Sequence, residues 1–267
     1  MNDDDLYTRL RALGFYALAD ALDDIIAAAI KKRWSPDQIF EHVADLEERE
    51  RARRSVERRM RISKLGRFKA MADFDWDWPT RVSPDAIHHV LSLDFMKHGH
   101  NVVLVGAQGL GKTMIAKNIV HNAVLAGHSA LFVTAADLLL DLAGQESARA
   151  LDRRMKHYAR FACLCIDEIG YLEYEQRAAD LLFQLVSRRY ESKSLVLTTN
   201  KSFSDWATIF PGAACATALV DRVVHHADVI HIEGKSYRLR ESELAQKAKP
   251  KRPPKRTPTK RPPTKKR

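Results

Sequence analysis

The stretch from Asn101 to Val120 reads NVVLVGAQGLGKTMIAKNIV: an apolar run, a glycine-rich turn that ends in Lys-Thr, and a run with helical periodicity. The turn fits the pattern G-x-x-x-x-G-K-[ST], which begins at Gly106 and ends with Lys112 and Thr113. Glycines let backbone N–H groups curl around a phosphate group, and the N-terminus of the following helix adds partial positive charge. The stretch therefore predicts a strand, a phosphate-binding loop and a helix, in that order.

The chemistry of this loop predicts that it holds ATP together with Mg²⁺. Lys112 is expected to neutralise the β- and γ-phosphates. Thr113 is expected to offer its hydroxyl to Mg²⁺, because a small hard cation prefers oxygen ligands. The predicted nucleotide-binding residues of the loop are Gly106, Ala107, Gln108, Gly109, Leu110, Gly111, Lys112, Thr113 and Met114.

The composition favours one sizeable folded core and a smaller module. The chain has 267 residues, of which 45% are hydrophobic, and this is enough to bury a core. It holds no long uninterrupted apolar run and no basic-then-apolar leader, so we expect a cytoplasmic protein without a membrane partner. The three cysteines, Cys163, Cys165 and Cys215, cannot form a paired framework, and we expect small core or surface residues there.

The positive charge is concentrated in two segments. The formal net charge is +10, but eleven Lys and Arg residues and no acidic residue lie from Lys247 onward, so the rest of the chain is nearly neutral. This tail of Lys, Arg, Pro and Thr cannot bury a core, and we expect residues 247–267 to be disordered. The second segment, from Arg49 to Lys69, holds ten basic residues against two acidic ones. Charge concentrated in this way points to nucleic acid as a partner.

Residues 1–72 are predicted to form a small helical domain. They lack strand alternation, and their apolar residues recur at helical spacing. Ser35 followed by Pro36 is a typical helix start, because serine caps the first turn and proline fits its first position. The sequence FDWDWP at 74–79 breaks the periodicity, which predicts an ordered linker that leads to another helix toward His98.

From Asn101 onward, predicted strands and helices alternate along the chain. The predicted strands are residues 102–105, 130–134, 161–166 and 195–199. Such alternation predicts an α/β fold in which a parallel sheet is flanked by helices and the ligand lies at the carboxyl ends of the strands. We place this domain in residues 73–246, between the helical domain and the basic tail.

Polar residues follow two of these strands. Asp167 and Glu168 come directly after the apolar run that ends at Ile166. Asp167 is expected to hold Mg²⁺ through water, and Glu168 to act as general base on the attacking water. Asn200 ends the next strand; it either orients the attacking water, contacts the γ-phosphate or simply forms a turn. The order of loop, Asp-Glu and Asn favours one of the two catalytic roles.

The order of these motifs resembles that of AAA+ ATPases, and specifically the IstB/DnaC-like family of transposition helpers and helicase loaders. The resemblance extends from about Asp4 to Glu243 and includes GAQGLGKT, CIDEIGYL, LTTN, LVDRVVHH and EGKSYRLR. The sequence DRVVHHADVIHIEGKSYRLR at 221–240 is more similar to the IstB-type ATPases of insertion sequences than to helicase loaders. The basic tail is not a feature of the family core.

The resemblance implies an AAA+ P-loop core without a large lid domain. It assigns Arg222 as an arginine finger that reaches the ATP site of the next subunit, where a guanidinium neutralises charge on the γ-phosphate. It assigns Arg238 as a further basic residue near the nucleotide, acting as a sensor. It also implies an ATP-dependent regulator of transposition that forms a ring or helical filament on duplex DNA, recruits the cognate transposase through the helical domain, and disassembles on hydrolysis.

Two other functions share parts of this pattern. A helicase loader of the DnaC type would carry every ATPase motif, and would bind a replicative helicase and single-stranded DNA. A phosphotransferase such as a small-molecule kinase would also need the glycine-rich loop, but it has less use for adjacent Asp-Glu or for an arginine that acts in the next subunit. Binding of duplex DNA and of a transposase distinguishes the favoured function from both.

A basic helix beside the strands is the predicted DNA contact. The sequence ARALDRRMK at 148–156 lies between the second and third predicted strands, where related loaders and initiators place DNA-facing helices. The predicted DNA-binding residues are Arg153, Arg154 and Lys156. The alternative is a solvated charged helix face without a partner.

Overall fold

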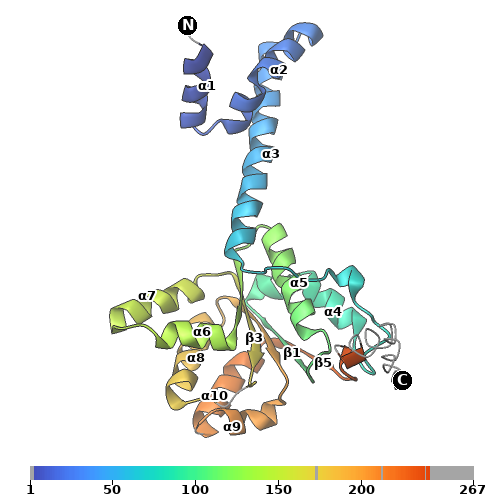
Figure 1. Ribbon diagram of the computed structural model, residues 1–267, viewed down its shortest axis with the longest axis vertical. Helices are drawn as coiled ribbons and strands as arrows, with labels where there is room; N and C mark the ends of the chain where they lie inside the picture. Colours follow the sequence, from blue (N-terminus) through green and yellow to red (C-terminus); the bar gives the residue numbers. More distant parts are fainter. Residues whose placement is uncertain (1–2, 172–173, 212, 238, 241–267) are drawn as a thin grey trace, which may run out of the picture.

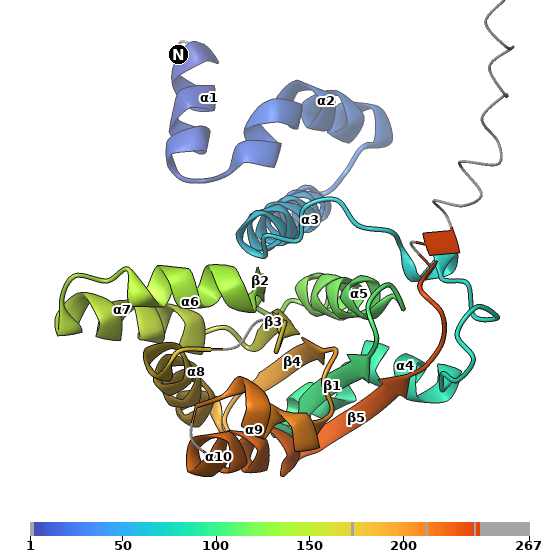
Figure 2. The same cartoon turned by 60° about the horizontal axis from the view of Figure 1, so that its bottom comes forward.

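The core of the protein is a parallel sheet of five strands, seen in a computed structural model that describes residues 3–171, 174–211, 213–237 and 239–240. The strand order across the sheet is β2-β3-β4-β1-β5, and every neighbouring pair is parallel (Figure 2). The strands are β1 (Asn101–Gly106), β2 (Ala130–Thr134), β3 (Cys163–Ile169), β4 (Ser194–Thr199) and β5 (Ala227–Ile232). This order places β4 between the strand of the glycine-rich loop and the strand of the Asp-Glu pair.

The predicted α/β fold with a parallel sheet is confirmed, and the four predicted strands are present. The third strand begins later than predicted, at Cys163, and continues through the carboxylate pair to Ile169. The fifth strand, β5, is an addition that the periodicity did not predict, because polar residues interrupt its apolar ones. The central strands are buried on both faces and therefore carry continuous apolar runs.

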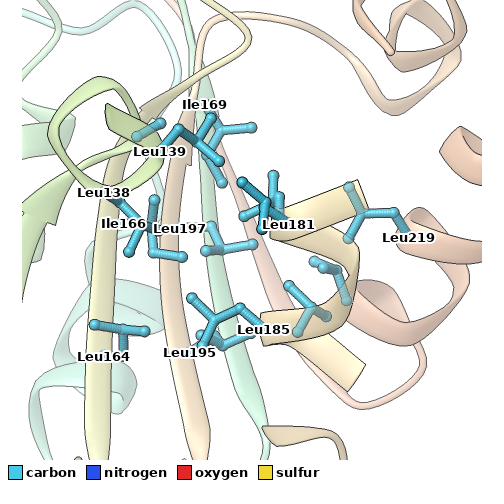
Figure 3. Packing of buried hydrophobic residues seen from close by; sticks show 14 of the residues in the cluster. Leu138, Leu139, Leu164, Ile166, Ile169, Leu181, Leu185, Leu195, Leu197 and Leu219 are labelled. Atoms are coloured by element: carbon cyan, nitrogen blue, oxygen red, sulfur yellow. The ribbon is translucent and has the colours of Figure 1, made fainter. Parts of the chain in front are cut away.

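Helices cover both faces of the sheet. One face packs against α6 (Ala135–Ala143), α7 (Ala148–Ala159), α8 (Gln176–Arg189), α9 (Trp206–Ile209) and α10 (Ala213–Val224). The other face packs against α4 (Pro84–Leu91) and α5 (Lys112–Leu125). Figure 3 shows the first core, where leucines of α6 and α8 meet Leu164, Ile166 and Leu197 of the sheet. Complete burial of one such side chain contributes about 1.5–3 kcal/mol.

A helical segment precedes the sheet, as predicted. It comprises α1 (Asp3–Ala12), α2 (Tyr16–Lys32) and the long helix α3 (Pro36–Ile62). The predicted start of α3 is confirmed: Ser35 accepts a hydrogen bond from the Gln38 backbone, and the Gln38 side chain accepts one from the Ser35 backbone. Figure 1 shows α3 as a rod that carries α1 and α2 at one end and meets the sheet domain at the other.

The rod is polar on nearly all sides, and ion pairs along its surface support it. Glu50 accepts hydrogen bonds from Arg53 and Arg54, and Arg53 also pairs with Glu57. Pairs at this spacing each stabilise an exposed helix by about 0.2–0.5 kcal/mol. Arg53 and Arg54 of the predicted basic cluster are therefore internally paired, so fewer of its charges remain for a partner than the sequence count suggests.

The end of α3 is attached to the sheet domain by backbone and side-chain contacts. The Phe132 N–H of edge strand β2 donates to the Ser63 carbonyl over 2.9 Å, and the Lys117 ammonium of α5 donates to the Leu65 carbonyl over 2.9 Å. The first of these bonds satisfies part of the free edge of β2. The chain then forms η1 (Met71–Asp73), α4 and η2 (Asp94–His98), which confirms the predicted linker and helix.

A buried arginine anchors the turn between α8 and β4. Arg189 is fully buried and donates to the carbonyls of Tyr158, Ala159, Phe161 and Ser194. Burial lowers the pKa of its guanidinium to about 10. The acceptors include the last carbonyls of α7, which carry the negative end of that helix dipole. The result is a rigid junction at the amino end of β4.

Two cysteines lie in the core, as expected. Cys163 and Cys165 are completely buried in β3 and are free thiols. Burial raises the pKa of Cys163 to about 12 and raises that of Cys165 well above its usual value, so both are inert packing residues. The side chain of Cys215 and the basic tail at 247–267 lie outside the described residues.

Within the described residues, β5 is followed by a short segment up to Arg240. Within this described part of the chain, no helix is long and apolar enough to cross a membrane.

Candidate functional site

The glycine-rich loop connects β1 to α5 in the predicted way. Gly109 and Gly111 have φ values of 78° and 89°, a region that side-chain-bearing residues rarely adopt. A Cβ atom on Gly106 would lie 2.2 Å from the Ile232 carbonyl oxygen of β5. Gly111 is also the residue before the first turn of α5, so the free N–H groups of that turn face the loop.

Lys112 is the first residue of α5, and its side chain folds over the loop. Its ammonium donates to the carbonyl oxygens of Gly106 and Ala107, both over 2.7 Å. These bonds hold the positive charge above the concave side of the loop. A bound phosphate would meet this charge together with the N–H groups of the helix N-terminus.

A pocket of about 490 Å³ opens beside this loop. This volume lies within the range for nucleotide-sized ligands. Glu168 and Asn200 line it from the ends of β3 and β4. The loop residues that line it are Gln108, Gly109, Leu110, Gly111, Lys112, Thr113 and Met114. The pocket therefore brings together residues from three separate strand ends at the carboxyl edge of the sheet, where such folds bind ligands.

The predicted Mg²⁺ residues lie together. Asp167 is 3% exposed, and its carboxylate accepts a hydrogen bond from the Thr113 hydroxyl over 3.0 Å and another from Thr198. A carboxylate and a hydroxyl at this separation, beside a phosphate-binding loop, form the oxygen donor set that Mg²⁺ prefers. The donors of Thr113 and Asp167 thus fit Mg²⁺ bound together with a nucleotide.

A bulge in β3 turns Glu168 toward the pocket. Three steps along β3, from Ile166 to Ile169, match two steps along β4, from Leu197 to Thr199, which is the signature of one extra residue. Glu168 has a φ of 63°, and its N–H donates to the Thr198 hydroxyl over 2.9 Å. Asp167 is therefore buried against Thr113 and Thr198, while Glu168 is exposed in the pocket. Strained backbone of this kind is characteristic of functional sites.

The strand order explains how Asn200 reaches the same pocket. It follows β4, which pairs with both β1 and β3. Its side chain is partly buried at the pocket wall. This position, between the loop and Glu168, suits contact with a terminal phosphate or an attacking water.

Arg222 lies away from the pocket of its own chain. It is on α10, where its guanidinium stacks 4.5 Å from the centre of the Phe183 ring and donates to the Ala218 carbonyl over 3.2 Å. It is absent from the described residues that line the pocket. A role at a phosphate group therefore requires a nucleotide held by another copy of the chain. Arg238, the other basic residue predicted near the nucleotide, lies outside the described residues.

A clasp, which we define as residues 73–81, 233–237 and 239–240, forms one wall of the pocket, and the sequence analysis missed it. The Tyr237 N–H donates to the Gly109 carbonyl over 2.8 Å, and the Trp78 indole donates to the Lys235 carbonyl over 2.7 Å. Arg240 pairs with Asp75 over 2.8 Å and stacks on Trp78. The conspicuous sequences FDWDWP and SYRLR were the available signals, but neither shows that the two segments meet.

The clasp is expected to contribute to ATP affinity. Arg240→Ala removes the Asp75 pair and the stacking on Trp78, so the dissociation constant for ATP should rise about fivefold, with little change in the rate at saturating ATP. Fluorescence titration with a labelled ATP analogue measures this. The matched control is Arg81→Ala, which removes an exposed pair with Glu233 on the same segments and should change affinity little. Equal affinities of the two variants would contradict this contribution.

The predicted DNA-binding residues share α7 but differ in their surroundings. Arg154 pairs with Asp141 and stacks on Tyr158. Burial raises the pKa of Tyr158 to about 12, and the hydrogen bond to Asp141 acts in the same direction. Arg153 is exposed, and no ion pair of its guanidinium is found among the described residues. Lys156 is exposed and pairs with Asp152 over 2.9 Å. Arg154 is thus engaged within the fold, whereas Arg153 and Lys156 face solvent.

Comparison with known proteins places this chain in a family. The sequence profile of the IstB-like ATP-binding proteins matches residues 8–245. The chain belongs to this family. It is 35% identical, over 74% of this chain and 78% of the relative, to a protein of insertion sequence IS5376 of Geobacillus stearothermophilus that is named for ATP binding. A protein of insertion sequence IS21 of Pseudomonas aeruginosa, also named for ATP binding, is 32% identical over 90% of this chain and 91% of its own.

A solved structure supports the fold of this IstB-like protein. The crystal structure of DnaI superposes with a TM-score of 0.52, covering 65% of this chain and 92% of its own, at 18% sequence identity. This likeness supports the predicted α/β fold. The family is described as ATP-binding, in agreement with the prediction from the glycine-rich loop.

Proposed function

We propose that this IstB-like protein is an ATPase that assembles on duplex DNA as a regulator of transposition, recruits the cognate transposase and disassembles when ATP is hydrolysed. One observation carries the proposal: the pocket holds the phosphate-binding loop and Glu168, while Arg222 lies on another side of the chain. The site as proposed is complete only when a second copy supplies that arginine. Membership of the IstB-like family supports the context of an insertion sequence.

The proposed hydrolysis uses residues at three strand ends. Lys112 and the N–H groups of α5 bind the phosphates. Glu168 accepts a proton from water as the water oxygen attacks the γ-phosphorus, the bond to the β–γ bridging oxygen breaks, and ADP and phosphate are released. Asn200 orients that water. Mg²⁺ bound at Thr113 and Asp167 would neutralise phosphate charge.

The proposed assembly is a homo-oligomer, a ring or helical filament, in which ATP binds neighbouring subunits together. Each subunit would present Arg222 to the nucleotide of the next one, so that loss of the γ-phosphate removes a charge that both subunits contact. Hydrolysis therefore acts as a timer for the assembly. This work on DNA would take place in the cytoplasm.

The proposed DNA surface joins α7 to the end of α3. Lys64, which follows α3, lies close enough to α6 and α7 to influence the pKa values of Asp141 and His157. Burial lowers the pKa of His157, and the charges of Arg154, Arg160 and Lys64 lower it further. The proposed surface joins Lys64 and Arg160 to the exposed Arg153 and Lys156, and such cations suit contact with phosphates rather than with base edges.

Removal of two exposed charges from α7 is expected to weaken DNA binding. The double variant Arg153→Ala/Lys156→Ala should lower affinity and reduce the salt slope by about 0.9 for each phosphate that is no longer neutralised, while ATP affinity is unchanged. Fluorescence anisotropy with duplex DNA over a salt series measures both quantities. The matched control, Arg81→Ala/Lys97→Ala, removes two exposed charges beside α4. An unchanged salt slope in the α7 variant would reject this surface.

The helical domain is the proposed docking site of the transposase. Between α2 and α3 lies an apolar groove of about 390 Å³, and Ile30 and Phe40 at this groove are 74% and 73% exposed. Large exposed apolar side chains in one groove are characteristic of protein-binding surfaces. Co-purification of the cognate transposase with the intact chain, and its loss in Ile30→Asp/Phe40→Asp, would support this docking.

Two measurements together test the proposed function. Duplex DNA should stimulate ATP hydrolysis, and the protein should bind a transposase of its own insertion sequence. Binding to a replicative helicase with stimulation by single-stranded DNA would instead identify a helicase loader. Phosphoryl transfer to a small molecule, independent of DNA, would identify a kinase.

A further inference from the structure

Histidines gather at the end of the sheet opposite the nucleotide pocket. His98 and His100 precede β1, and His225 and His226 precede β5, so that four of the eleven histidines of the chain lie in one region. Glu191, in the turn before β4, lies against His225 and His226. None of these residues lines the nucleotide pocket. The proposed ATPase leaves this group unexplained.

The geometry points to a metal site. We propose that Glu191, His225 and His226 bind a transition-metal ion of the Zn²⁺ class. Each residue offers one ligand atom, and the three atoms lie within 4.8 Å of one another. One carboxylate oxygen of Glu191 is 3.8 Å from His226 Nε2 and 3.9 Å from His225 Nδ1. In a tetrahedral zinc site such ligand atoms lie about 3.4 Å apart, so small side-chain rotations close the difference.

The backbone holds these residues in place before any ion binds. Glu191 has a φ of 55°, and the N–H groups of Ser192 and Lys193, which follow it, both donate to the Arg189 carbonyl over 3.0 Å. Arg189 itself is fully buried. The Asn101 N–H donates to the His226 carbonyl over 2.7 Å, which fixes the junction of α10 and β5. Ligands on rigid supports bind an ion at a lower entropic cost.

Neighbouring rings contact the two imidazoles. The Tyr190 hydroxyl lies 2.8 Å from His225 Nδ1, the nitrogen that faces Glu191, so an ion bound through this nitrogen would replace the contact with Tyr190. The ring of His100 stacks on that of His226, with centroids 5.1 Å apart and an interplanar angle of 9°.

The donor set selects the class of ion. Two imidazole nitrogens and one carboxylate suit Zn²⁺ and its neighbours among the transition metals, whereas Mg²⁺ and Ca²⁺ prefer oxygen ligands alone. The site is therefore chemically distinct from the oxygen donors of Thr113 and Asp167. Mg²⁺ would serve ATP hydrolysis, and an ion of the Zn²⁺ class would bind at the opposite end of the sheet.

A bound ion would tie α10 to the turn before β4. Arg222 lies on α10 about one helical turn before His226, so the ion would restrict the helix that carries the proposed arginine finger. The effect on Arg222 rests on the proposed function, but the binding of the metal does not. Measuring metal binding without nucleotide or DNA therefore tests the site independently of the proposed function.

Isothermal titration of the full chain with ZnCl₂ in the presence of excess Mg²⁺ tests the site. We expect the wild type to bind one more Zn²⁺ ion per chain than the double variant His225→Ala/His226→Ala. Glu191→Gln, which keeps the shape of the side chain, should weaken binding at this site by at least about tenfold. The control His128→Ala, an exposed histidine on another loop, should bind as the wild type does.

A Co²⁺ titration adds a spectroscopic signature. Tetrahedral coordination by imidazole and carboxylate should give visible d–d absorption bands in the wild type and in His128→Ala, and these bands should disappear in the double variant. The same ion stoichiometry and affinity in the double variant and the wild type would overturn the proposal. Absence of Zn²⁺ binding by the wild type would also overturn it.

Discussion

The variant Glu168→Gln is expected to bind ATP with wild-type affinity and to hydrolyse it about 100-fold more slowly or worse. The amide keeps the size of the side chain in the pocket but cannot accept the proton of the attacking water. Because ATP then persists in the pocket, assemblies on duplex DNA should last longer than those of the wild type. Phosphate release assays and DNA-bound lifetimes, each with and without duplex DNA, measure the two effects.

Two further variants, Lys112→Ala and Glu146→Gln, serve as comparisons for Glu168→Gln. Lys112→Ala removes the positive charge above the loop and should weaken ATP binding by about 100-fold, so that neither hydrolysis nor assembly occurs. Glu146→Gln makes the same chemical change as Glu168→Gln on an exposed loop between α6 and α7, and should behave as the wild type. A Glu168→Gln protein with the wild-type rate of hydrolysis would contradict the proposed general base.

The variant Arg222→Ala is expected to bind nucleotide normally and to lose DNA-stimulated hydrolysis by about 1000-fold or more. An arginine that reaches the γ-phosphate of a neighbouring subunit supplies an effect of this size. Arg222→Lys should remain impaired, because lysine keeps the charge but lacks the planar fork of donors. Thermal melts of both variants measure the stability that the Phe183 contact provides, which we expect to be about 0.5–2 kcal/mol.

Mixing variants tests whether Arg222 acts between subunits. Arg222→Ala lacks the arginine that each subunit supplies to the site of the next one. Lys112→Ala lacks the lysine that binds ATP in its own pocket. In a mixture, an Arg222 from a Lys112→Ala subunit can face the intact pocket of an Arg222→Ala subunit, so part of the activity should return. No recovery at any ratio, or wild-type hydrolysis by Arg222→Ala alone, would exclude the proposed finger.

The sequence was sufficient to predict the parallel sheet and the pocket residues at the strand ends, because both depend on strong local signals. The apolar runs of β1 and β4 are continuous, and the glycine-rich loop has a fixed pattern that follows a strand. In a parallel sheet the carboxyl ends of strands meet at one edge. Glu168 and Asn200 were therefore expected near the loop, and the structure places both at the pocket.

Features that depend on contacts between distant segments escaped prediction. The clasp joins Trp78 and Asp75 to residues after β5, and no local pattern reports such a pairing. Arg189 belongs to a charged stretch that resembles a solvated helix end, yet it is fully buried because four carbonyls converge on it. The engagement of Arg154 by Asp141 is a further example, since charge counts do not show which cations are paired.

Electron microscopy of the protein with duplex DNA and a non-hydrolysable ATP analogue tests the central claim most directly. The proposed function predicts rings or helical filaments around the DNA, with Arg222 of each subunit facing the nucleotide of the next. It also predicts that the assemblies are absent with ADP and absent in Lys112→Ala. Monomers scattered on DNA irrespective of the nucleotide, or an assembly in which Arg222 faces away from every nucleotide, would contradict it.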